Sequence, residues 1–167
     1  MAILNETLDW KQIVTANPKV ALAFRGVPTK VLLAQNEMLA RLITTECRRL
    51  GISGNELFLS PWWTEWGATF ALIARFKSVS PRDVVRGKFA VTQEFSRELD
   101  SLAQVIIDQP VYAWRGPARH QDDKVSGVTH MGGGTQFYLP NLASDTQGLS
   151  SRVAHLHSFT SVDWLTQ

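Results

Sequence analysis

The feature that most constrains this chain is a run of three glycines, Gly132, Gly133 and Gly134, placed directly before the apolar stretch 135–139. Consecutive glycines adopt backbone angles that are closed to other residues, and they let a ligand lie against the bare main chain. The stretch that follows has the composition of a strand, which Pro140 ends. We therefore expect a glycine cradle beside a strand that presents the polar Gln136 to a small molecule.

A second interpretation of the same residues is a glycine-rich turn between two strands, because a lone glycine run is a weak motif. The composition does not separate the two. The chain has 167 residues, of which 44% are hydrophobic and 19% are charged, so we expect a single globular domain over 1–167. The net charge of +2 is too small to argue for a nucleic-acid partner. Cys47 is the only cysteine, which leaves no disulfide framework within the chain and no cysteine-based metal site.

The N-terminal residues carry neither a basic start nor the apolar run of a signal peptide. No stretch approaches the roughly 20 apolar residues that span a bilayer. We therefore expect a cytoplasmic protein without a membrane partner, which as an effector would be exported by a route that needs no such signal.

The first two thirds of the chain, about residues 1–108, have mainly helical patterns. In residues 29–50 the apolar positions recur at mixed three- and four-residue steps, which predicts a long amphipathic helix. Ser60 and Ser80 are each followed by proline, as at the start of a helix. An apolar stripe then runs from Val84 to Ile106. Residues 69–76 suit either a helix or a buried strand.

The last third, about residues 109–167, changes character. Residues 111–115 and 135–139 read as strands, residues 118–130 as a polar loop, and residues 152–164 alternate like a final strand. The sum is an α+β domain with a helical N-terminal two thirds followed by a mostly antiparallel sheet.

Titratable clusters are sparse. His155 and His157 share one face of the last predicted strand, but no third metal ligand accompanies them, so we predict no metal site. Two Arg-Gly pairs, at Arg25 and Arg115, each close an apolar run. An arginine beside glycine can fork onto a phosphate while the backbone approaches closely, although a solvated arginine is the commoner case.

The stretch from Trp114 to Ala118, followed by Gly132 to Phe137, resembles NAD glycohydrolase toxins similar to the tuberculosis necrotizing toxin. More broadly it resembles the ADP-ribosyltransferase-like superfamily of bacterial polymorphic toxins. The resemblance covers about 30 residues of the chain. It implies an ADP-ribosyltransferase-like fold and NAD as the substrate. It places Gln136 at the catalytic site and makes Arg115 a phosphate contact.

The same resemblance implies roles for the neighbouring residues. Trp114 or Phe137 would flank the nicotinamide, and Arg25 is a candidate for the arginine of the first strand. The glycines and Thr135 would lie against NAD. A Glu-x-Glu pair, typical of many protein-modifying transferases, is absent from the final third. We therefore favour hydrolysis of NAD over transfer of ADP-ribose to a protein or nucleic-acid acceptor. A cognate immunity protein is a further expected partner.

The alternative is a non-enzymatic binding module, such as an immunity protein, an inhibitor or a phage-associated protein. In that case the glycines form a turn. Trp62, Trp63 and Trp66 would then be partly exposed to meet a partner, whereas as ordinary aromatic residues they belong in the core.

Overall fold

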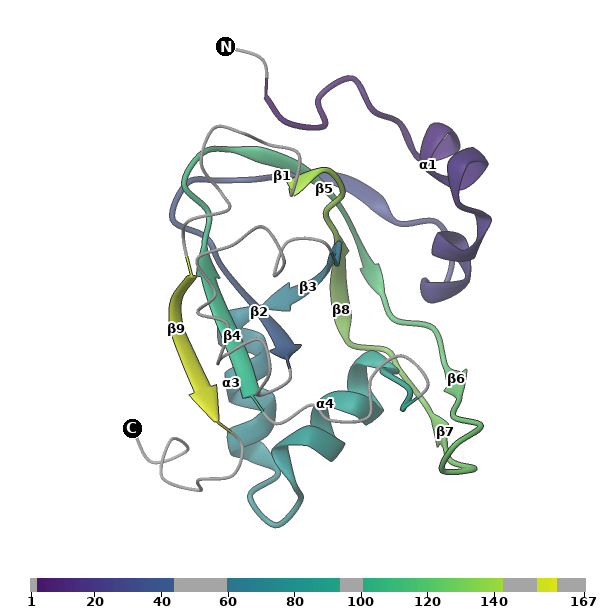
Figure 1. Ribbon diagram of the computed structural model, residues 1–167, viewed down its shortest axis with the longest axis vertical. Helices are drawn as coiled ribbons and strands as arrows, with labels where there is room; N and C mark the ends of the chain where they lie inside the picture. The colour runs from purple at the N-terminus through teal and green to yellow at the C-terminus, as the bar shows by residue number, and fades with distance from the viewer. Residues whose placement is uncertain (1–2, 44–59, 94–100, 143–152, 159–167) are drawn as a thin grey trace.

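The computed structural model describes residues 3–43, 60–93, 101–142 and 153–158, the last of these as backbone. The described residues form a seven-stranded sheet in which every neighbouring pair of strands is antiparallel. The strand order is β1-β5-β8-β3-β2-β4-β9, so β1 and β9 form the two edges (Figure 1). The strands are β1 (Thr29–Leu33), β2 (Met38–Ile43), β3 (Trp62–Glu65), β4 (Ser101–Ile106), β5 (Val111–Pro117), β8 (Thr135–Tyr138) and β9 (Val153–Ser158).

Two short strands form a separate hairpin, β6 (Gln121–Asp122) with β7 (Thr129–His130). The described helices are short: α1 (Trp10–Ala16), the 3-10 helix η1 (Pro18–Ala23), α3 (Trp66–Arg75) and α4 (Pro81–Phe89). A capping box starts α1, because Asp9 Oδ1 accepts from the Gln12 N–H and the Gln12 side chain accepts from the Asp9 N–H. Proline begins α4, as the Ser-Pro pair predicts, and Ala90 in the left-handed conformation ends it.

The predicted architecture, helical over residues 1–108 with the sheet confined to the last third, is wrong. Sheet strands come from all along the chain: residues 29–33 and 38–43 are β1 and β2, and residues 101–106 are β4. Most positions of β2 and β4 are buried, so their apolar residues run together instead of alternating. Such a run has no clear two-residue period and is easily taken for a helix. The strands predicted over 111–115 and 135–139 are confirmed, and β9 lies within the predicted final strand.

The two faces of the sheet carry different cores. The helix face, which carries Gln136, is covered at one end by α1 and η1 and at the other by α3 and α4 (Figure 1). The first cluster is Ile13, Val20, Phe24, Trp114 and Tyr138, and the second is Ala40, Leu42, Ile73, Val85, Phe89 and Leu102. The opposite face carries a larger cluster that includes Trp63, Phe137 and Leu139. Between these two groups of helices, the helix face carries a cavity lined by Ala23 of η1 and Phe89 of α4.

Candidate functional site

Two adjoining cavities open on the helix face, between η1 and α4. The larger holds about 220 Å³ and the smaller about 60 Å³. They share the lining residues Trp62, Phe89, Val91 and Gln136. The larger cavity is also lined by Ala23, Ala90, Thr92, Arg119 and Gln121. We call the two together the Gln136 cavity.

Gln136 is placed by β8, opposite Gly116 of β5 and Thr64 of β3. Its side chain is buried, with 7% of the residue exposed, and not at a rim as the sequence suggests. Its Nε2 donates to the Ala23 carbonyl oxygen at 2.8 Å, and within the described residues its Oε1 has no hydrogen-bond donor. The amide therefore fixes η1 to the sheet and leaves one acceptor at the cavity.

The smaller cavity has an apolar lining with a few convergent polar groups. The hydroxyls of Thr64 and Thr69 are hydrogen-bonded at 2.7 Å, and Thr64 Oγ1 also donates to the Ala40 carbonyl oxygen at 3.2 Å. The Ser60 hydroxyl oxygen is buried there without a partner among the described residues. An apolar pocket with few oriented polar groups is the usual form of a small-molecule site.

Trp62 supplies the aromatic wall of both cavities. Its half-buried ring lies 4.9 Å from that of Tyr138 and 5.5 Å from that of Phe24, measured between centroids. Burial raises the pKa of the Tyr138 hydroxyl, so this aromatic cluster stays neutral. Of the tryptophans expected as core or partner contacts, Trp63 is fully buried on the opposite face, whereas Trp62 and Trp66 are half-buried.

The glycine run is not an anion cradle in this structure. The N–H groups of Gly132 and Gly134 donate to the carbonyl oxygens of Gly87 and Lys88, both at 2.9 Å. Gly133 donates to the Ala118 carbonyl oxygen at 2.8 Å. All three amides therefore have protein partners, which leaves none to hold a phosphate.

These glycines are required by close packing of the main chain. A Cβ at Gly132, whose φ is +69°, would lie 2.5 Å from the Ala118 carbonyl oxygen. A Cβ at Gly134 would lie 2.6 Å from the Phe89 ring. The run thus lets the segment before β8 pass between the end of β5 and α4.

Several residues expected at the NAD site lie elsewhere. Arg115 is exposed and pairs with Phe137, so both side chains are on the face opposite Gln136. Phe137 is buried in the core of that face. Trp114 shares the face of Gln136 but is 1% exposed inside the cluster under α1 and η1. Thr135 is exposed at the start of β8, outside the cavity lining.

The structure does bring Arg25 to the glycine run. Its Nη2 donates to the Met131 carbonyl oxygen at 3.3 Å and lies 3.9 Å from where a Cβ on Gly133 would stand. Arg25 is exposed, so its guanidinium faces solvent beside the run.

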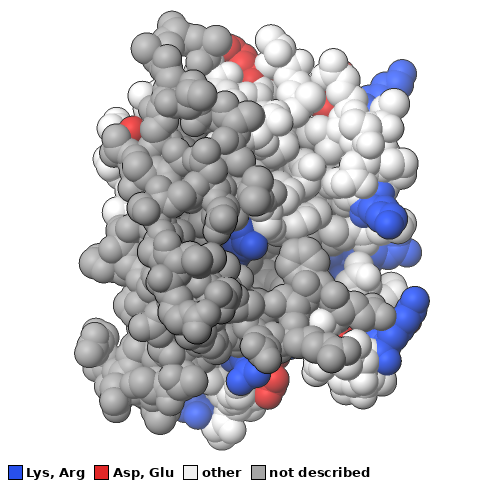
Figure 2. Space-filling view, viewed as in Figure 1, with Lys and Arg blue, Asp and Glu red and all other residues white. Residues whose placement is uncertain are grey.

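Arg119 is the arginine that lines the larger cavity, and it was not among the predicted site residues. Its backbone N–H donates at 2.9 Å to the Ala23 carbonyl oxygen, the same atom that accepts from Gln136. The available signal was its position three residues after Gly116, in a segment interpreted as a polar loop. Figure 2 shows Lys and Arg side chains along the right-hand edge of the molecule, over α1, η1 and the β6–β7 hairpin.

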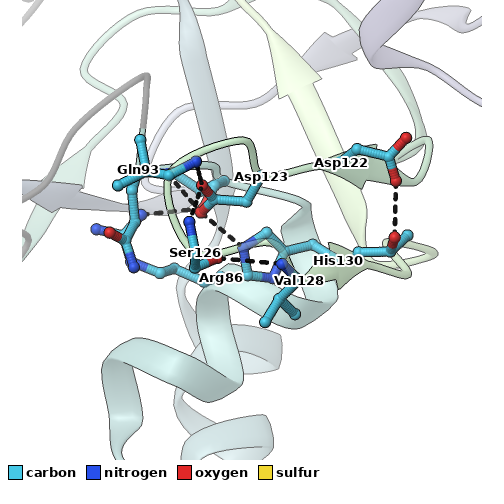
Figure 3. Close-up of polar contacts among 10 residues, drawn as sticks. Arg86, Gln93, Asp122, Asp123, Ser126, Val128 and His130 are labelled. Atoms are coloured by element: carbon cyan, nitrogen blue, oxygen red, sulfur yellow. Dashed lines mark hydrogen bonds and ion pairs between the residues drawn. The ribbon is translucent and has the colours of Figure 1, made fainter.

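A second polar cluster joins the β6–β7 hairpin to the chain after α4 (Figure 3). The buried Asp123 carboxylate accepts from the N–H groups of Gln93, Val125 and Ser126 at 2.8, 2.9 and 3.1 Å. His130 Nε2 lies 3.3 Å from the same carboxylate. Burial alone would raise the pKa of Asp123, but these hydrogen bonds hold it well below its ordinary value.

Arg86 of α4 is buried next to this cluster, and its Nη1 donates to the Val91 carbonyl oxygen at 3.0 Å. Burial lowers the pKa of its guanidinium, and the charge of Arg82 acts in the same direction, while that of Asp123 opposes both. The cluster therefore fixes the hairpin against the end of α4.

Among the described residues no group of three or more histidine, cysteine, aspartate or glutamate side chains could hold a metal ion. His155 and His157 lie on β9, where only the backbone is described, opposite Gln104 and Leu102 of β4. Cys47 lies outside the described residues. No helix in the described ranges has the length and apolar character needed to cross a bilayer.

No protein-family model matches this sequence, and no curated protein does. Among solved structures, the chain is similar to a chain of the complex described as "Rhs1-CT in complex with cognate immunity protein RhsI1". The alignment covers 81% of this chain and 83% of that chain, with a TM-score of 0.53 and 14% sequence identity. At this level of identity the likeness is one of fold.

Proposed function

We propose that this chain is one member of a toxin–immunity pair. The support is the likeness of its fold to a chain in the complex of Rhs1-CT with the immunity protein RhsI1. Sharing a fold does not by itself assign an activity, so the role within the pair is argued from the site.

Within such a pair we propose the enzymatic role, cleavage of the nicotinamide–ribose bond of NAD. The observation that carries this proposal is the position of Gln136 and Arg119 at one cavity, both hydrogen-bonded to the Ala23 carbonyl oxygen. One offers an amide acceptor and the other a cation. A dinucleotide needs both, for a ribose hydroxyl and for the pyrophosphate.

This reaction can proceed without a side chain that acts as a general acid or base. As the bond from C1 of the ribose to the nicotinamide nitrogen lengthens, positive charge builds on the ribose. Gln136 Oε1 would accept from a ribose hydroxyl and orient the ring, while Trp62 would lie against the nicotinamide. Water then forms the new bond to C1, giving ADP-ribose, nicotinamide and a proton. A protein or nucleic-acid hydroxyl in place of water would give transfer instead.

The basic edge shown in Figure 2 suits the doubly negative pyrophosphate of NAD. Arg119 would contact the pyrophosphate at the mouth of the cavity, and the exposed Arg25 would add to the attractive field. The size of the cavity, about 220 Å³ with an adjoining 60 Å³, suits the nicotinamide ribose end of NAD more than the whole molecule. The adenosine end would then lie outside it.

Binding is the first test of this proposal. Titration calorimetry of the purified chain with NAD, ADP-ribose and nicotinamide should give the tightest binding with NAD. We expect Gln121→Leu, a change within the cavity lining, to weaken binding less than Gln136→Leu does. Absence of binding heat with all three compounds would contradict NAD as the substrate.

A second candidate is the non-enzymatic module, an immunity protein, an inhibitor or a phage-associated protein. One observation favours it: the amides of the glycine run are all bonded within the chain, which removes the expected phosphate site. It predicts a chain that binds a protein and releases no nicotinamide from NAD. Nicotinamide release therefore separates the two candidates directly.

A further inference from the structure

A groove of about 660 Å³ lies on the other side of α4 from the Gln136 cavity. It runs between the α3–α4 region and the β6–β7 hairpin. Figure 1 shows the end of α4 beside the hairpin. We call it the hairpin groove. The proposed NAD chemistry makes no use of it.

Exposed apolar side chains gather in the hairpin groove. Of the nine large hydrophobic residues exposed in the described part of the chain, four line it: Phe76, Val79, Val128 and Met131. Met131 is 69% exposed and Val128 is 52% exposed. Clustered exposed apolar surface beside polar groups is typical of a protein–protein contact, whereas scattered single residues need no explanation.

The walls of the groove are fixed before anything binds. Gly132 donates to the Gly87 carbonyl oxygen at 2.9 Å and so joins the end of the hairpin to α4. The Asp123 carboxylate holds the hairpin turn and the Gln93 N–H together (Figure 3). A preformed groove avoids the entropy cost of ordering its walls on binding.

The charges around the groove are mainly basic. The exposed Lys88 of α4 lines the groove. Arg75 and Lys77 are exposed on either side of the lining residue Phe76, and Lys124 is exposed two positions before the lining residue Ser126. In the described part of the chain, the exposed acidic residues nearby are Asp83, which lines the groove, and Asp122, which is hydrogen-bonded to the lining residue Thr129 at 2.7 Å. Charge complementarity therefore favours an acidic segment whose apolar side chains enter the groove.

We propose that the hairpin groove docks an apolar segment flanked by Asp and Glu, contributed by the protein partner of this chain. The proposal rests on the toxin–immunity pairing proposed above and is independent of NAD. It would place the partner beside the candidate site, because Val84, Gly87 and Lys88 of α4 line the groove, whereas Phe89 and the two residues after it line the Gln136 cavity. A partner docked here would contact the same helix without entering the cavity.

The test is selection from a phage-displayed library of random peptides on the immobilised chain, followed by titration of the selected synthetic peptides. We expect peptides with two or more large apolar residues flanked by Asp or Glu. Met131→Glu and Val79→Glu should each weaken binding by about tenfold or more, because the new charges meet apolar and acidic groups of the peptide. Val27→Glu is the matched control, since Val27 is 80% exposed and outside the groove.

Melting curves establish that each variant is folded, and all three positions are exposed, so large losses of stability are not expected. Three results would overturn the proposed docking of an acidic segment in the groove. They are selection of no peptide, selection of peptides without acidic residues, and selection of peptides that bind both groove variants as tightly as the wild type. Peptides that bind elsewhere would leave the proposed pairing standing. Sedimentation of the unliganded chain tests a second copy as the occupant: a dimer disrupted by Met131→Glu would contradict the proposed partner.

Discussion

Gln136 donates a hydrogen bond from its side-chain Nε2 to the carbonyl oxygen of Ala23 at 2.8 Å, across 113 positions of the sequence. This contact holds η1 against β8 on the helix face and forms one side of the cavity between η1 and α4. The same side chain therefore contributes to stability and is a candidate for binding the substrate. Measuring the free energy of unfolding and the turnover of NAD on the same Gln136 variant separates the two roles.

Replacing Gln136 with leucine should lower stability only modestly. The hydrogen bond is lost, but the Ala23 carbonyl oxygen keeps the Arg119 N–H as a donor, so no buried acceptor is left unsatisfied. We expect a loss of about 1 kcal/mol in the free energy of unfolding. For a chain of this size that is about 2–4 °C in Tm. Arg115→Ala, a change at an exposed residue of the opposite face, should stay within about 0.5 kcal/mol in the same calorimetric melts.

The glycine run should be intolerant of side chains. Gly132→Ala places a Cβ against the Ala118 carbonyl oxygen and requires a left-handed backbone, so we expect a loss of about 2–5 kcal/mol. Gly87→Ala is the control, because nothing lies within 4 Å of its added Cβ in α4, and it should gain about 0.5–1 kcal/mol. Urea unfolding measures both. Equal stability of the two variants would contradict the close packing described for the run.

The sequence predicted β5 and β8, the strands before and after the glycine run, and the start of α4. β5 and β8 follow from short β-rich runs bounded by glycine or proline, and α4 follows from its Ser-Pro start. It failed for β1 and β2. Their apolar residues, separated only by residues 34–37, mimic helical spacing when read as one segment.

The site was predicted in part. Gln136 was singled out because it follows the glycine run and through the resemblance to NAD glycohydrolase toxins, and the structure places it at a cavity. Arg115 was chosen by its nearness in sequence, but only strand pairing decides on which face a side chain lies. Arg119 and Trp62 reach the cavity through the sheet order, β5-β8-β3, which no local pattern encodes.

Arg119 rather than Arg115 should govern affinity for NAD. Arg119→Gln removes the cation at the larger cavity, and we expect a loss of about tenfold in Kd, or ~1.4 kcal/mol. Arg115→Gln should bind like the wild type. Raising the salt concentration should weaken the wild type more than Arg119→Gln, because the lost contact is ionic. Calorimetric titration gives both values, and a larger effect at Arg115 would contradict the assigned face.

Stability should depend on pH through Asp123. Its pKa is held below the unfolded value of about 3.9, so its contribution is present above that pH and is lost as the pH falls further. Asp123→Asn should therefore be less stable at pH 7 and lose less stability than the wild type on acidification below about pH 4. Parallel curves for the two proteins in acid would show that the carboxylate is not the responsible group.

The central claim is that the Gln136 cavity cleaves NAD, and release of free nicotinamide from NAD by the purified chain tests it most directly. Wild type and Arg115→Ala should release nicotinamide at the same rate. Gln136→Leu, folded by its melting curve, should be slower by a factor of ten or more, which corresponds to ~1.4 kcal/mol or more of transition-state stabilisation. No nicotinamide from the wild type, or equal rates for wild type and Gln136→Leu, would contradict the account.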